Sequence, residues 1–179
     1  MTPSDREIAA HADPDFEQHF LVSPEKLSKL VSAAGIRPTD DVLEVGAGIG
    51  TVARELPRSR SLTLVELDDR LFGHLQQNVP HANVVQGDAL EIISTMSFDV
   101  LIGNLPHMVT ESLLRLMPSL TFRTAVLAVG ETTDLDQLGA DFSWSEVAKI
   151  TGNDFLPPQS GVSRIVRVAP TSGKSQPVQ

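Results

Sequence analysis

The residues with the clearest chemical meaning form a glycine-rich loop and an acid further along the chain. Residues 44–51 read EVGAGIGT and separate an apolar run from a helical pattern. Glycines let the backbone turn tightly and approach a ligand closely, and the start of a helix offers free amide groups. Glu66 ends the next apolar run, about 20 residues after Gly46, where a carboxylate typically binds a ribose hydroxyl. Together these features predict a site for a nucleotide-containing cofactor.

Two later segments carry hydrogen-bond acceptors. Asp88, in the segment GDAL at 87–90, is placed to accept hydrogen bonds from an adenine amine. Asn104 opens the segment NLPH at 104–107 and supplies an amide oxygen, while Pro106 fixes the backbone so that a carbonyl can point inward. Two convergent acceptors hold the protons of an amine, direct its lone pair towards an electrophile and stabilise positive charge developing on nitrogen. The pattern predicts group transfer to an amine nitrogen.

These segments need a scaffold that brings the ends of several strands together. Short apolar runs predict strands, and helical periodicity predicts helices between them. We expect strands at 41–45, 62–65, 83–85, 98–102 and 125–129, an edge strand at 163–168, a helix after Ser23-Pro24, and helices at 51–57, 68–78 and 109–119. The alternation predicts an α/β fold with a doubly wound, Rossmann-like sheet. The sheet should be mostly parallel, with an antiparallel C-terminal edge strand, and should bind ligands at the carboxyl ends of its strands.

The composition limits function and location. The 179 residues include 14 Lys and Arg against 23 Asp and Glu, for a net charge of −9, and no Cys. This charge disfavours general binding of nucleic acid, because phosphate affinity depends on neutralising charge. Without Cys there is no disulfide or thiolate metal site, and the isolated histidines lack metal-ligand spacing. No apolar run reaches the ~18 residues of a membrane span. We therefore expect a cytoplasmic protein without metal or membrane association.

The polar ends of the sequence define the expected domain. Residues 1–15 and 171–179 are rich in polar residues and proline, and they predict an N-terminal tail and a disordered C-terminal tail. A single domain is expected at 16–170, and no repeat divides it. The sequence makes no prediction of oligomeric state.

Taken in order, several segments resemble the ribosomal RNA adenine dimethyltransferase family. They are FEQHFL at 16–21, the glycine loop, ELD at 66–68, GDAL at 87–90, NLP at 104–106 and FLPPQSGVS at 155–163. The ordered set is far more specific than any single motif. It covers residues 16–170, which correspond to the family's catalytic domain without its C-terminal helical domain. The resemblance implies a methyltransferase sheet, S-adenosylmethionine as methyl donor, and the adenine of RNA as acceptor.

The resemblance also implies roles for individual residues. One group would surround the cofactor, from its methionine end through the ribose to the adenine: Gln18, His19, Leu21, Gly46, Ala47, Gly48, Glu66, Leu67, Asp88, Ala89 and Asn104. A second group would form the catalytic segment beside the target amine: Asn104, Leu105, Pro106 and His107. Within these groups Glu66 would hold the ribose and Asp88 the adenine.

Departures from the family pattern leave the acceptor open. The family usually has Tyr or Phe after Asn-Leu-Pro, where the ring stacks on the target adenine, and this chain has His107. An imidazole offers a smaller stacking face and a polar edge. The stretch 130–154 is shorter than in the family and has a loop-like composition. We keep two acceptors: the adenine of RNA, and a small-molecule amine, which the acidity of the chain and His107 favour.

Two other classes of function are weaker alternatives. A degenerate member of the family would bind the cofactor without catalysis. A nicotinamide-dependent oxidoreductase would use the same glycine loop and acid, but Thr51 stands where the third glycine of the dinucleotide-binding fingerprint belongs. The sequence thus favours an N-methyltransferase over both.

Overall fold

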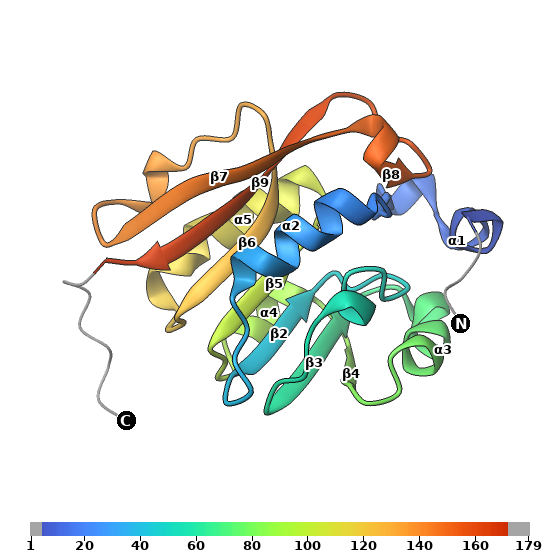
Figure 1. Cartoon of the computed structure of the whole chain (residues 1–179), viewed down its shortest axis with the longest axis horizontal. Helices are drawn as coiled ribbons and strands as arrows, with labels where there is room; N and C mark the ends of the chain where they lie inside the picture. Colours follow the sequence, from blue (N-terminus) through green and yellow to red (C-terminus); the bar gives the residue numbers. More distant parts are fainter. Residues whose placement is uncertain (1–4, 172–179) are drawn as a thin grey trace.

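A seven-stranded sheet forms the centre of the molecule (Figure 1). The structure, a computed structural model, describes residues 5–171. The strand order is β4-β3-β2-β5-β6-β9-β7, with the first five strands parallel and the last two antiparallel to their neighbours. The strands span β2 Asp41–Val45, β3 Ser61–Glu66, β4 Asn83–Gln86, β5 Val100–Gly103, β6 Thr124–Gly130, β7 Phe142–Thr151 and β9 Val162–Pro170. The predicted doubly wound, mostly parallel sheet is confirmed.

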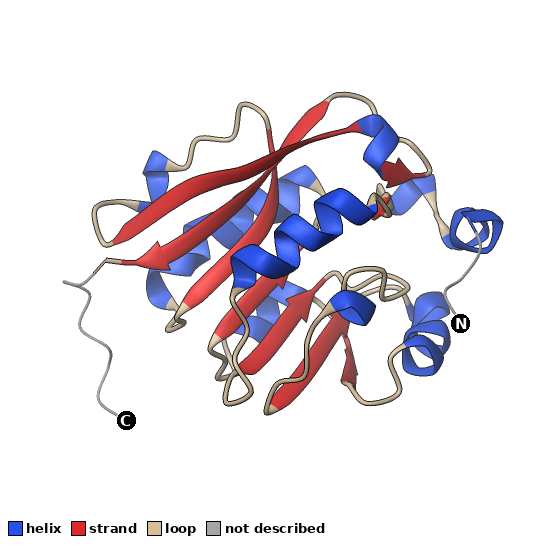
Figure 2. Cartoon of the chain, viewed as in Figure 1, coloured by secondary structure: helices blue, strands red, loops and turns tan. Residues whose placement is uncertain are grey.

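Helices cover both faces of this sheet (Figure 2). α2 begins after Ser23 with a proline in its first turn and ends at Gly35, whose φ of 53° lies in the left-handed region. It covers one face, and α4 and α5 lie against the other (Figure 1). The helices span α1 Asp5–His11, α2 Pro24–Ala34, α3 Asp69–Asn78, α4 Ala89–Ile93 and α5 His107–Leu116, with short 3-10 turns η1 Pro14–Phe16, η2 Ala53–Glu55, η3 Met117–Ser119, η4 Asp136–Leu138 and η5 Gly152–Asp154.

The core is divided by the sheet because alternate side chains of a strand point to opposite faces. Val42 and Val100 pack with the apolar face of α2, whereas Leu43 and Leu101 pack with the side chains of α5. Burying a large aliphatic side chain stabilises the fold by about 1.5–3 kcal/mol. The two apolar clusters therefore hold the parallel strands in one register, with their carboxyl ends at a common edge.

A second, two-stranded sheet brings distant segments together. β1 Phe20–Leu21 pairs antiparallel with β8 Phe155–Leu156. The amides of Val22 and Ser23 also donate to the carbonyl oxygen of Asp154. The segment before α2 thus lies beside the segment that follows β7.

The prediction of a helix at 51–57 is wrong. The structure has only the 3-10 turn η2 there. Gly46, Gly48 and Gly50 all have positive φ, so the chain is still turning at the end of the loop. Pro57 then follows closely, which leaves too few residues between the turn and the proline for an α-helix.

The loop-like interpretation of residues 130–154 is also wrong, because this stretch contains the ten-residue strand β7. A register shift between Glu146 and Ala148 interrupts its pairing with β9. Such a bulge breaks the period of two by which a strand is recognised in sequence. The C-terminal strand β9 is antiparallel as expected, and β7 lies outside it, so two strands form that end of the sheet.

The expected N-terminal tail contains regular structure. α1 and η1 occupy most of residues 5–16, and Ile8 is buried against Phe20, Ile49 and Leu71. A single buried side chain in a polar segment gives no periodic signal, which explains the difference. Apart from Thr171, the expected C-terminal tail lies outside the described residues.

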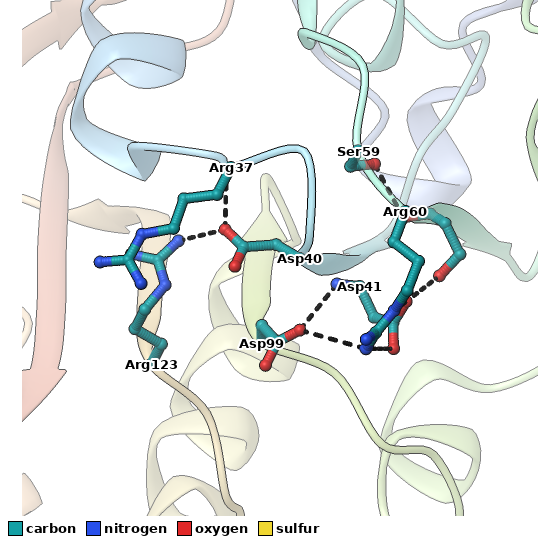
Figure 3. A network of polar contacts seen from close by, with 8 residues as sticks. Arg37, Asp40, Asp41, Ser59, Arg60, Asp99 and Arg123 are labelled. Carbon is teal, nitrogen blue, oxygen red and sulfur yellow. Dashed lines mark hydrogen bonds and ion pairs between the residues drawn. The ribbon is translucent and has the colours of Figure 1, made fainter.

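Ion pairs join the loops at the amino ends of the strands (Figure 3). Arg123 donates to the buried carboxylate of Asp40, which also accepts the Arg37 amide at 2.8 Å. Arg60 forms a bidentate contact with Asp41 and lies 3.6 Å from Asp99. These contacts link the starts of β2, β3, β5 and β6 at the edge opposite the carboxyl ends.

Candidate functional site

A pocket of about 500 Å³ opens at the carboxyl ends of the parallel strands. Its wall combines the glycine loop after β2, the ends of β3 and β6, and the segments that follow β4 and β5. The N-terminal segment around β1 and the segment after β8 complete it. Parallel α/β sheets bind ligands at this edge. The sheet therefore gathers the chemically interesting segments of the sequence into one cavity.

The glycine loop has a shape that side chains would disturb. Gly46 and Gly48 have φ of 68° and 58°, a region that residues with a Cβ rarely adopt. A Cβ at Gly48 would lie 2.7 Å from Cε1 of Phe20, and one at Gly46 would collide with Leu105. The glycines let the loop pass directly beneath β1 and beside the segment after β5, so backbone atoms form the pocket wall there.

Two carboxyl groups lie in the interior of this pocket. Glu66, at the end of β3, accepts hydrogen bonds from the amides of Gly48 (2.6 Å) and Asp68 (2.9 Å). Burial raises the pKa of Glu66, and these amide hydrogen bonds partly oppose the rise. Glu44, on β2, is 3% exposed, and its Oε2 has no hydrogen-bond partner among the described residues. The carboxylate of Glu66 is thus oriented by the backbone, whereas Glu44 is not.

The N-terminal segment is tied to the pocket by polar contacts. The Nε2 of Gln18 donates to Asp68 at 2.8 Å, and Asp68 also binds Arg70, whose guanidinium holds the pKa of Asp68 down at about 2. Asp68 caps α3 through the Arg70 amide. The Nδ1–H of His19 donates to the carbonyl oxygen of Pro157 at 2.9 Å. Gln18 and His19 line the pocket, and these hydrogen bonds join the N-terminal segment to the start of α3 and to the segment after β8.

The catalytic segment begins directly at the end of β5. The Nδ2 of Asn104 donates to the carbonyl oxygen of His19 at 3.2 Å, which fixes the orientation of the amide and identifies Oδ1 as its acceptor. The carbonyl of Pro106 accepts the amide of Thr110 in the first turn of α5. The carbonyl of Leu105 accepts the Thr110 hydroxyl at 3.2 Å and has a second lone pair. His107 starts α5 and lines the pocket.

Most predicted site residues lie together. Leu67 is 56% exposed at the pocket wall, and Asp88 caps α4 through the amide of Leu90 at 2.8 Å, with Ala89 beside it. The exception is Leu21, which is completely buried in the core under α2 and does not line this pocket. The alternation of β1 explains this, because Phe20 faces the glycine loop and Leu21 must then point to the other side.

Several lining residues were not predicted. They come from the end of β6, from α5 and from the segment after β8: Ala128, Val129, Gly130, Thr110, Gln159 and Ser160. Their types carry no chemical signal in the sequence. Glu44 did carry a signal, because a lone acid inside an apolar strand needs a reason to be buried.

The residues of the pocket fit an S-adenosylmethionine-sized ligand. The glycine loop leaves space that a Cβ would occupy, the backbone orients Glu66 to accept hydroxyl groups, and Glu44 presents an oxygen that has no hydrogen-bond partner among the described residues. Among residues 5–171 no group of three or more His, Cys, Asp or Glu could hold a metal ion, and no helix could span a membrane. The sheet and this pocket define the class of Rossmann-like, S-adenosylmethionine-dependent methyltransferases.

Within this class the chain belongs to the ribosomal RNA adenine dimethylase family, whose model matches residues 9–169. The ribosomal RNA small subunit methyltransferase A of Dehalococcoides mccartyi is 31% identical over 176 residues, covering 85% of this chain and 60% of that protein. A ribosomal RNA small subunit methyltransferase of Arabidopsis thaliana is 30% identical, covering 86% and 50%. The resemblance found in the sequence is thereby confirmed. The chain spans about 60% of the length of the first of these relatives.

Solved structures agree with this assignment. A dimethyladenosine transferase from Plasmodium falciparum superimposes with a TM-score of 0.77 at 25% identity, covering 86% of this chain and 64% of that one. The 23S rRNA methyltransferase ErmE gives a TM-score of 0.76 at 25% identity, with coverage of 86% and 70%. The predicted methyltransferase sheet is therefore confirmed.

Proposed function

We propose that this chain is an S-adenosylmethionine-dependent N-methyltransferase whose acceptor is an adenine amine in ribosomal RNA, and that residues 16–170 form its catalytic domain. The observation that carries the proposal is the placement of Asn104 in the same pocket as Glu66. One residue provides an oriented amide and the other an oriented carboxylate. Family membership and the names of the relatives support the same activity. A cytoplasmic location is part of the proposal.

Separate residues would bind the cofactor and orient the methyl acceptor. The carboxylate of Glu66 accepts ribose hydroxyls, and Asp88 accepts the amine of the cofactor's adenine. Gln18 and His19 cover the methionine end. S-adenosylmethionine supplies an electrophilic methyl group on a positively charged sulfur. The Oδ1 of Asn104 accepts a proton of the target amine, directs its lone pair towards the methyl group and stabilises the charge that develops on nitrogen.

His107 would contact the acceptor. It lies at the first position of α5, beside Gly130: a Cβ on Gly130 would be 3.4 Å from its Nδ1. Gly130 therefore leaves the imidazole room at the pocket wall. A ring in this place can stack on a base that has been turned out of an RNA strand.

A small-molecule amine is the second candidate, and the charge of the pocket favours it. Its described lining includes Glu17, Glu44, Glu66 and Asp88 and no Lys or Arg. A phosphate-bearing substrate meets no compensating charge at such a surface, whereas a neutral or cationic amine is not repelled. In this case His107 would hydrogen-bond to the acceptor rather than stack on it.

Methyl transfer from isotopically labelled S-adenosylmethionine tests both candidates. The purified chain is incubated with unmethylated small-subunit ribosomal RNA or with a low-molecular-weight cell extract, and label is followed in each fraction. Label in adenine supports the main proposal, and label only in small molecules supports the second. Cofactor binding without transfer to either fraction would indicate a degenerate, non-catalytic member of the family.

Glu66→Ala tests the cofactor site separately. The variant loses a charge-assisted hydrogen bond, so the affinity for S-adenosylmethionine should fall by about 1–3 kcal/mol in titration calorimetry. The matched variant Glu55→Ala changes an acid outside the lining of this pocket and should bind normally. Unchanged affinity in Glu66→Ala would contradict the ribose assignment.

A further inference from the structure

Glu44 is an acid whose burial the fold itself does not require. Across the sheet its register partners are Leu64 on β3 and Ile102 on β5, both completely or almost completely buried. An aliphatic residue would suit this position better, because burying a carboxyl group without partners destabilises a protein. Yet Glu44 lines the pocket, and its Oε2 lacks a hydrogen-bond partner among the described residues. A built site with an unused acceptor points to a ligand.

The neighbouring acid shows that the two carboxyl groups are not equivalent. Glu66 uses both oxygens to accept backbone amides, which fixes it and favours its charged form. Glu44 has no such amide on Oε2, and the negative charge of Glu66 repels a second negative charge beside it. Burial and this repulsion raise the pKa of Glu44 to about 8. At neutral pH and without a cation beside it, Glu44 therefore carries a proton.

No positive side chain neutralises Glu44 within the described part of the chain. The other charged or titratable groups of the pocket and of the elements packed on that face are Glu17, His19, Asp88 and His107 in the lining, Asp68, Asp69, Arg70 and His74 at α3, Glu25, Lys26 and Lys29 on α2, Arg54 and Glu55 in η2, and Glu146 and Lys149 on β7. Lys26 and Lys29 pair with Glu25, and Arg70 pairs with Asp13 and Asp68. The repulsion from Glu66 is the charge effect that reaches Glu44.

We propose that Glu44 is the counter-charge for the positively charged methyl donor, and that binding the donor expels a proton from Glu44 to solvent. This inference rests on the proposed function. The O–H bond of the carboxyl group breaks, its electron pair stays on oxygen, and the resulting carboxylate faces the cationic ligand. After methyl transfer the sulfur is neutral, so the carboxylate has lost its partner and takes up a proton again. Glu44 thereby makes the pocket favour the donor, with its sulfonium charge, over the product, whose sulfur is neutral.

The proposal predicts that the affinity for the donor depends on pH, whereas the affinity for the product does so much less. Because donor binding releases a proton, its affinity should increase as the pH rises towards 8, by up to about tenfold per pH unit. S-adenosylhomocysteine, which lacks the sulfonium charge, should bind with little pH dependence. The ratio of the two affinities therefore rises with pH.

Titration calorimetry of the whole chain measures the expelled proton directly. S-adenosylmethionine and S-adenosylhomocysteine are each titrated at pH 7.5 in phosphate and in Tris, whose ionisation enthalpies differ. The wild type should release close to one proton with the donor and much less with the product. Glu44→Gln should abolish the release and reduce the preference for the donor about tenfold or more, whereas Glu17→Gln, at another acid of the pocket lining, should keep the proton release.

The outcomes separate this inference from the proposed function. Failure of the wild type to bind either ligand would contradict the proposed function. Binding with equal proton release for both ligands, or release that persists in Glu44→Gln, would overturn the role of Glu44 alone. If Glu44→Gln does not fold, infrared spectroscopy of the wild type decides. The band of a protonated carboxylic acid should disappear on adding the donor and persist with the product, and a band unchanged by both would refute the proposal.

Discussion

The two edges of the central sheet use the same residue types in opposite ways. At the amino ends of the strands, Asp40 and Asp41 contact arginines (Figure 3). At the carboxyl ends, Glu44 and Glu66 are also buried, but no described Lys or Arg lines their pocket. Glu44 and Asp41 belong to the same short strand. The two edges differ in the charged groups that surround their acids, not in the acids themselves.

The pKa values follow this division. Burial raises the pKa of Asp40, but the Arg37 amide and the Arg123 guanidinium outweigh it, so the pKa lies below its ordinary value. The Arg60 guanidinium lowers the pKa of Asp41. Stability from these groups is present above the ordinary pKa of Asp and is lost as the pH falls through the lowered values. At the other edge burial raises the pKa of both glutamates.

The paired acids of the amino edge serve folding stability, whereas the unpaired acids of the carboxyl edge serve ligand binding. A buried charge that is already paired has no reason to attract a ligand, whereas a buried acid without a cation is costly until one arrives. The ion pairs of the amino edge therefore hold the loops together whether or not a ligand is bound. The carboxyl edge retains hydrogen-bond acceptors that can bind the cofactor and the methyl acceptor.

The largest expected effect on stability is at the ion pair between Arg123 and Asp40. Arg123→Ala leaves the carboxylate of Asp40 buried and without its guanidinium, so the free energy of unfolding should fall by on the order of 3 kcal/mol. Urea denaturation followed by circular dichroism measures it. The control Lys149→Ala, in an exposed pair with Glu131, should cost little. Unchanged stability together with lost cofactor binding in Arg123→Ala would contradict a purely structural role for the amino edge.

The carboxyl edge should show the reverse pattern. Asn104→Ala removes the oriented acceptor, so turnover should fall about 100-fold or more, with much smaller effects on cofactor affinity and stability. Steady-state kinetics measures turnover and calorimetry measures cofactor affinity. The control Asn83→Ala, at an exposed position of β4, should change neither. Equal losses in binding and turnover would instead assign Asn104 a folding role.

The pH dependence of stability should also differ between the two edges. The folded chain keeps the proton of Glu44 at pH values where the unfolded chain has lost it, so this group makes stability fall as the pH rises from about 4.5 to about 8. This fall should be absent in Glu44→Gln. Thermal or urea unfolding at several pH values tests this. A parallel pH profile for both proteins would contradict the protonated state of Glu44.

The smallest effect is expected at His107, and its sign identifies the acceptor. Base–aromatic stacking contributes roughly 1–3 kcal/mol per base, so His107→Phe or His107→Tyr should preserve activity on RNA or raise it a few-fold. If the acceptor is a small polar molecule, the same variants remove a hydrogen-bonding group and fill space, and activity should fall. Binding of bare RNA should also be weak, with a shallow dependence on salt.

Part of the site could be predicted because it depends on local chemistry. Gly46 and Gly48 are where the chain needs positive φ, and Glu66, Asp88 and Asn104 each follow a short apolar run. In a parallel sheet such positions must meet at one edge, so the order of the motifs along the chain was enough to predict the fold and the location of the pocket, but not the majority of its lining residues.

The remainder was decided by contacts between distant segments. Leu21 belongs to the core because pairing of β1 with β8 turns Phe20 towards the glycine loop. β7 exists because β9 supplies its hydrogen bonds despite the bulge. The different states of Glu44 and Asp41 depend on Glu66 and Arg60, which come from a neighbouring segment. A sequence specifies the type of each side chain, but its burial and its charged neighbours, and hence its chemistry, exist only after the chain has folded.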